Sequence, residues 1–107
     1  MTERKRAVTE KRDIGGRIKK LEEEQGVSLR GFKVSATDGP AGKIEQVLYW
    51  SDNRVPDYIV VSNRRLLLAR KSVLPVEIIE RIDVKNRNIR IALSRQEIRE
   101  APEYLPL

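Results

Sequence analysis

The stretch DYIVVSNRRLLLARK, residues 57–71, decides the fold class of this 107-residue chain. Two β-rich runs, Asp57–Ser62 and Leu66–Lys71, flank the polar pair Asn63-Arg64, and this pattern predicts an antiparallel hairpin. With a two-residue turn at that pair, both faces of the hairpin are apolar, whereas a half-buried hairpin should alternate apolar and polar residues. We therefore expect the second face to be covered by residues outside the main core.

Two interpretations explain what covers this second face. Either the N-terminal helical stripe or the C-terminal helix lies over it, or it is a surface for a second copy or another protein partner. In the expected register Val60 faces Leu67, and both lie on this face. The candidate partner surface consists of Tyr58, Val60, Leu67, Ala69 and Trp50.

Further short β-rich runs lie on both sides of the hairpin, separated by turn residues, a pattern typical of a small sheet or barrel. They span Phe32–Ala36, Lys43–Trp50, Glu80–Val84 and Ile89–Leu93. Pro75 has no N–H to donate to a ladder, so residues 73–74 should form an edge segment or the end of a strand. We expect a mainly β fold, and closure into a barrel would remove the exposed edges of so small a sheet.

Helices are expected at both ends of the chain. Ile14, Ile18 and Leu21 are spaced as one narrow helical stripe, and Gly26 is placed to end that helix. The chain thus divides into a basic tail with a marginal helical arm, residues 1–28, and a β domain, residues 29–107.

At the other end, Ser94-Arg95-Gln96-Glu97 has the pattern of a capping box. It predicts a short helix from Arg95 to about Glu100. Asp38, which precedes Gly39, is expected to act locally in a turn.

The order of turn glycines and apolar residues resembles the PRC-barrel family, named after the photosynthetic reaction-centre H subunit. The residues that carry the resemblance are Gly31-Phe32-Lys33-Val34, Asp38-Gly39, Gly42-Lys43-Ile44, Val47-Leu48, Tyr58–Val61, Val73-Leu74-Pro75, Ile82-Asp83-Val84 and Ile89–Leu93. The ending, from Leu93-Ser94 through Ile98 to Pro102-Glu103-Tyr104, resembles that of free-standing bacterial members. The resemblance covers about Leu29 to Tyr104. It implies a small six-stranded PRC-type β-barrel that acts as an adaptor, with no catalytic residues to carry over.

Two specialised members of the family differ from this chain. The reaction-centre subunit is membrane-anchored, whereas no apolar stretch here approaches the roughly 20 residues of a membrane span. The ribosome maturation factor carries paired tyrosines ahead of its barrel, where this chain reads Ser28-Leu29-Arg30-Gly31.

The composition lacks two residue types that carry much of enzyme chemistry. The chain has no Cys and no His, so a thiol nucleophile, a disulfide and the usual general base at neutral pH are not available. The N-terminus has no apolar signal region. We expect a cytoplasmic, non-enzymatic protein without cofactor or metal, which binds an unidentified protein partner and forms a homodimer.

Basic residues support an alternative function. The net charge of +6 is divided equally between residues 1–30 and 31–107. The candidate anion or RNA patch consists of Arg64, Arg65, Arg70 and Lys71. Such a patch attracts phosphate backbones, but few aromatic residues are present for base stacking. An RNA- or ribosome-associated module that uses the hairpin and the N-terminal arm is therefore possible but not favoured.

Overall fold

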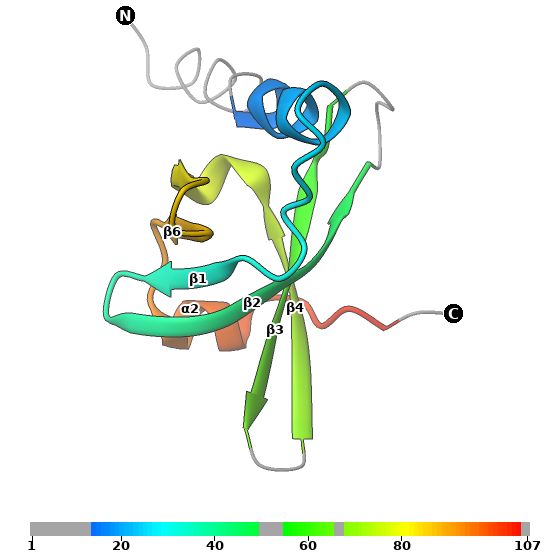
Figure 1. Cartoon of the computed structure of the whole chain (residues 1–107). Coiled ribbons are helices and arrows are strands. Elements are labelled where there is room, and N and C mark those ends of the chain that lie inside the picture. Colours follow the sequence, from blue (N-terminus) through cyan, green and yellow to red (C-terminus); the bar gives the residue numbers. More distant parts are fainter. Residues whose placement is uncertain (1–13, 50–54, 66–67, 106–107) are drawn as a thin grey trace, which may run out of the picture.

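A computed structural model describes residues 14–49, 55–65 and 68–105, without the side chains of residues 64, 65, 68 and 69. A helix over residues 14–23 precedes six strands (Figure 1). The strands are β1 (Lys33–Ala36), β2 (Gly39–Leu48), β3 (Tyr58–Arg65), β4 (Leu68–Pro75), β5 (Ile79–Asp83) and β6 (Asn88–Ile91). A short 3-10 helix, η1 (Val76–Ile78), separates β4 from β5, and α2 (Arg95–Glu100) follows β6. The prediction of a mainly β fold is confirmed.

The six strands form one mixed sheet in the order β4-β3-β2-β1-β6-β5. Only β1 and β6 pair in parallel, and the other neighbours are antiparallel. The edge position predicted for residues 73–74 is confirmed, since they lie near the end of the edge strand β4.

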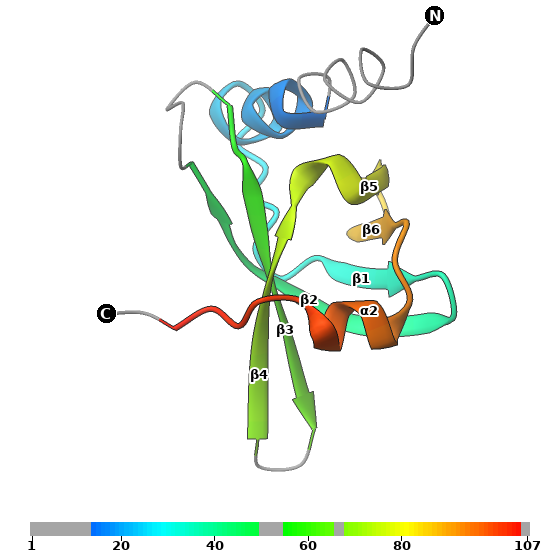
Figure 2. The same ribbon diagram turned by 180° about the vertical axis from the view of Figure 1, so that it is seen from behind.

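The expected closure into a barrel is wrong, because no ladder joins β4 to β5 in the described part of the chain. The outer edge of β4 pairs instead with the C-terminal residues. The Val73 N–H donates to the Pro102 carbonyl, and the Tyr104 N–H donates to the Lys71 carbonyl, both at 2.8 Å. Beyond Pro75, which has no N–H to extend the ladder, η1 leads the chain away from β4 toward β5 (Figure 2).

The register expected for the hairpin is also wrong. The ladder between β3 and β4 runs from Tyr58↔Pro75 to Arg65↔Leu68, so Val60 faces Val73 rather than Leu67. In this register Leu74 faces Ile59, and both are buried in the core. A turn at residues 63–64 would take Leu74 out of its pairing with Ile59. It would also end β3 before Arg65 and start β4 before Leu68. Residues 66 and 67, which join the strands, lie outside the described part of the chain.

The hairpin extends farther than the strand beside it. The ladder between β2 and β3 reaches Ser62, paired with Lys43, whereas the ladder between β3 and β4 continues to Arg65. The far half of the hairpin therefore projects past the rest of the sheet as a two-stranded ribbon (Figures 1 and 2).

The helix over residues 14–23 belongs to the main core. Ile18 and Leu21 are buried in the same cluster as Phe32 and the inward residues of the strands. The Arg17 Nη2 donates to the Ile82 carbonyl of β5 at 3.1 Å. Gly26 follows the helix with φ of +65°, which suits a helix C-terminus. The helix predicted from the apolar stripe is confirmed, and Ile18 and Leu21 of that stripe pack in the main core.

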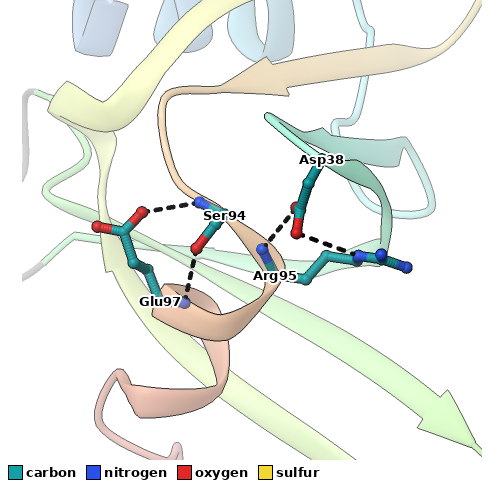
Figure 3. Close-up of polar contacts among 4 residues, drawn as sticks. All are labelled: Asp38, Ser94, Arg95 and Glu97. Atoms are coloured by element: carbon teal, nitrogen blue, oxygen red, sulfur yellow. Dashed lines mark hydrogen bonds and ion pairs between the residues drawn. The ribbon is translucent and has the colours of Figure 1, made fainter.

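The start of α2 is fixed by two carboxylates (Figure 3). Ser94 Oγ accepts from the Glu97 N–H at 3.1 Å, and Glu97 Oε1 accepts from the Ser94 N–H at 2.9 Å. This is the predicted capping box. Asp38, from the turn before β2, accepts a hydrogen bond from the Arg95 N–H at 2.9 Å and lies 3.6 Å from the Arg95 Nε. Asp38 thus acts on a residue 57 positions away, beyond the local turn role expected for it.

Candidate functional site

Three strands of the sheet carry side chains on a face opposite the main core, which we call the outer face. Directly paired residues of antiparallel strands point to the same side. Because Ile59, Val61 and Leu74 belong to the core cluster, their neighbours along β3 and β4 point outward. From β2 across β3 to β4, the outward residues form three rungs: Lys43–Ser62–Lys71, Gln46–Val60–Val73 and Leu48–Tyr58–Pro75.

A C-terminal segment, which we call the tail (residues 101–105), pairs briefly with the edge of β4 at Lys71–Val73 and crosses this strand after leaving α2 (Figure 2). Its backbone joins the ladder through the two hydrogen bonds of Val73 and Lys71 described above and through an isolated bridge between Ser72 and Glu103. The tail therefore adds a short antiparallel pairing to an edge that would otherwise be open.

The middle rung meets the tail. The Gln46 Nε2 of β2 donates to the Tyr104 Oη at 3.1 Å, although the tail pairs with β4 and β3 lies between the two strands. The two side chains together therefore span β3 and β4 on the outer face. Val60, at the centre of that rung, is 0% exposed and is not a member of the core cluster. The Tyr104 hydroxyl, bonded to Gln46, therefore lies on the same rung as this buried residue.

A β-bulge gives this face two consecutive polar residues of β2. The register shifts between Ile44 and Gln46. In a regular strand successive side chains point to opposite faces, but Glu45 and Gln46 both make contacts on the outer face here. Glu45 pairs with the Lys71 Nζ at 3.5 Å, and Gln46 bonds to Tyr104. Two cross-strand contacts thus span β3 side by side.

Two of the predicted basic residues contact carboxylates. The Arg70 Nη2 donates to the Ala101 carbonyl at 2.7 Å, and its Nη1 lies 3.3 Å from a Glu103 carboxylate oxygen. Lys71 pairs with Glu45. Arg70 and Lys71 therefore hold the tail and the sheet together, and each has an acid beside it that reduces its attraction for a phosphate.

The third rung presents only apolar and aromatic side chains. Leu48, Tyr58 and Pro75 are directly paired across three strands, and each is half-buried. Next to it along the chain, the Tyr49 hydroxyl donates to a Glu22 carboxylate oxygen at 3.4 Å. Partial burial, together with the charge of Glu22, raises the pKa of Tyr49. This contact ties the end of β2 to the N-terminal helix.

The residues predicted for the partner surface have different positions. Tyr58 is on the outer face and half-buried, whereas Val60 is buried and has no free surface in this chain. Ala69 lies in β4, but its side chain is not described, and Trp50 and Leu67 fall outside the described residues.

Of the predicted basic patch, Arg64 and Arg65 end β3 in the projecting ribbon, with side chains that are not described. Arg70 and Lys71 are neighbours in β4 that reach in different directions, one to the tail and one to β2.

Sequence reasoning did not assign Glu45, Gln46 and Tyr104 to this face, or Glu103 to the contact with Arg70. A polar residue in a β-rich run is normally interpreted as facing solvent, and a bulge leaves no reliable trace in the pattern. A terminal Pro-Glu-Tyr carries no strand signal of its own. Tyr104, two residues after Pro102, was the aromatic residue that could have indicated packing of the tail on the sheet.

Among the residues that the structure describes, no group of three or more acidic side chains is arranged to hold a metal ion. In the same part of the chain, no helix has the length and apolar character needed to cross a membrane. Comparison of the sequence with models of known protein families and with curated proteins finds no match.

Proposed function

We propose that this chain is a non-catalytic docking module of the PRC-barrel kind, which binds protein and forms a homodimer through the outer face of its sheet. The observation that carries the proposal is the rung Leu48–Tyr58–Pro75, three apolar or aromatic side chains aligned across β2, β3 and β4 and left half-buried. Tyrosine with aliphatic neighbours is the composition typical of interface centres. The resemblance to PRC-barrel proteins supports the same role.

The chemistry of the rung favours a second copy as the occupant. The chain carries a net charge of +6, so two copies repel each other through most of their surfaces. Leu48, Tyr58 and Pro75 are apolar or aromatic, and a two-fold axis allows the same rung to pack on itself. Burial of such side chains contributes about 25 cal/mol per Å² of apolar surface.

Nucleic-acid binding is the weaker candidate. Arg70 and Lys71 are paired with Glu103 and Glu45, which leaves Arg64 and Arg65 as the predicted patch residues without a described acidic partner. Two cations of the hairpin release few counterions, so an RNA interface would depend largely on the basic N-terminal arm.

Sedimentation velocity of the nuclease-treated protein over a hundredfold range of concentration tests the proposal. We expect a monomer–dimer equilibrium that salt does not weaken, because the interface is apolar and salt screens the repulsion between two chains of charge +6. Tyr58→Asp should shift the chain to monomer. Ala92→Asp adds the same charge at an exposed position between β6 and α2 and should leave the dimer intact.

Circular dichroism of each variant separates lost association from lost folding, and Leu48→Lys provides a second variant on the same rung. A chain that stays monomeric at every concentration contradicts the homodimer. Co-purification with nucleic acid that is lost steeply with salt and in Arg64→Glu/Arg65→Glu supports the alternative instead.

A further inference from the structure

We propose that the outer edge of β4 is a docking site for an extended peptide of a protein partner, and that the chain's own tail occupies this site in cis. The inference rests on the proposed protein-binding function and names the class of ligand. The tail shows the chemistry that the site accepts, because an extended segment is already bound there as an added strand.

Backbone groups of β4 fix the direction of the bound segment. The Val73 N–H donates to a carbonyl of the segment, and the Lys71 carbonyl accepts from an N–H two residues farther along. These bonds accept any sequence in the extended conformation, and they set an antiparallel orientation relative to β4.

Side chains of the sheet select the sequence. The Arg70 guanidinium faces the carboxylate of Glu103, and the Gln46 amide meets the phenol of Tyr104 over the buried Val60. An acidic residue followed directly by a tyrosine satisfies both groups. The ligand class is therefore an extended peptide that contains Glu-Tyr or Asp-Tyr after a residue with a free backbone carbonyl.

The contacts of the tail leave room for a better ligand. The bond from Arg70 to Glu103 is long, at 3.3 Å, and the two side chains are 38% and 45% exposed, a setting in which ion pairs contribute little. The Arg70 Nε is buried without a hydrogen-bond partner in the described part of the structure. A carboxylate that bonds to Nε and a terminal nitrogen together would form the stronger bidentate pair.

The tail can leave while the fold remains. Ile98 of α2 is buried in the core, and the helix start is held by Ser94, Glu97 and Asp38. These contacts all precede Ala101. Ala101 ends α2 and packs against the core, so detachment of residues 102–105 frees the edge of β4 without releasing α2.

Titration of the full-length chain with a nine-residue peptide of the sequence REAPEYLPL, residues 99–107 of the chain, tests this proposal. The receiving chain carries Glu103→Ala/Tyr104→Ala so that its own tail binds weakly, and amide resonances are followed by NMR. We expect saturable shifts that are largest at Lys71 and Val73. Binding to the unmodified chain should be at least tenfold weaker, because a tethered competitor has an effective concentration on the order of 1 mM.

Charge reversal provides the specific control. In the opened chain, Arg70→Glu should weaken binding of the peptide at least tenfold, and a peptide with Arg in place of its second Glu should recover most of that loss. If the double variant does not fold, a fluorescein-labelled copy of the peptide is titrated with the unmodified chain and should show saturable binding at millimolar concentrations of the chain.

The proposal is overturned if the peptide gives no shifts in a folded receiving chain, or if the shifts lie away from β4 and do not respond to Arg70→Glu. The homodimer is tested independently by Tyr58→Asp. Loss of peptide binding with an intact dimer contradicts only this inference, and a monomer that binds the peptide contradicts only the homodimer.

Discussion

Gln46 and Tyr104 are 58 residues apart in the sequence, and the side-chain amide of one donates to the phenol of the other at 3.1 Å. The contact spans β3 and β4 on the rung of Val60, which is 0% exposed. One face of the hairpin is thus buried in the core, and the other meets the tail at its middle rung while Tyr58 and Pro75 stay half-buried.

Removal of the Tyr104 side chain should measure how much this contact contributes to the free energy of unfolding. Tyr104→Ala removes the contact on the rung of Val60, and we expect the free energy of unfolding in urea to fall by about 2 kcal/mol. Tyr104→Phe keeps the ring and should cost about 1 kcal/mol for the lost hydrogen bond. Leu105→Ala, at a neighbouring position that is 73% exposed, should change stability by less than about 0.5 kcal/mol. Equal stabilities of Tyr104→Ala and Leu105→Ala would contradict the assigned role.

Gly42 is the position in β2 where a side chain is least tolerated. Its φ is +120°, and an added Cβ would collide with the Ser62 carbonyl oxygen of β3. We expect Gly42→Ala to destabilise the fold by about 2–3 kcal/mol in urea denaturation.

Gly16 in the N-terminal helix is the matched control. An added Cβ there has no neighbour within 4 Å, and Ala favours a helix over Gly by up to about 1 kcal/mol. Gly16→Ala should therefore raise stability. A Gly42→Ala variant as stable as the parent chain would show that β2 and β3 are not packed as described.

Stability should fall in acid partly because of Asp38. The hydrogen bond from the Arg95 N–H, assisted by the Arg95 charge, lowers the pKa of Asp38 below its ordinary value of 3.8. A depressed pKa means that the stabilisation is complete above the unfolded-state pKa and is lost as pH falls through the folded-state pKa. Asp38→Asn should therefore flatten the dependence of Tm on pH below about pH 4.

Asp83 provides a comparison within the same chain. Hydrogen bonds from the Asn86 side chain and backbone lower the pKa of Asp83 as well, so Asp83→Asn should flatten the same region of the profile. If the dependence of Tm on pH below about pH 4 is unchanged in Asp38→Asn but flattened in Asp83→Asn, the loss of stability in acid comes from the β5–β6 turn and not from Asp38.

Local signals predicted most elements of the fold. Ser94 and Glu97 determine the start of α2 through contacts three residues apart, and the stripe of Ile18 and Leu21 is buried as its spacing indicates. Such features depend on short segments, so the sequence reveals them directly.

Features that depend on distant partners were not predicted. Asn63-Arg64 looked like a turn because polar residues are common there, but burial of Leu74 opposite Ile59 sets a register with the turn beyond Arg65. Likewise the edge of β4 pairs with the tail and not with β5. No local sequence pattern indicates which of the two segments pairs there.

Intermolecular NOEs test the homodimer proposal most directly. In an equal mixture of isotopically labelled and unlabelled chains, isotope-filtered spectra should show contacts from the Tyr58 ring of one copy to the Leu48 methyl groups of the other. Absence of intermolecular NOEs at millimolar concentration, or NOEs confined to residues away from Leu48, Tyr58 and Pro75, would contradict the proposed interface.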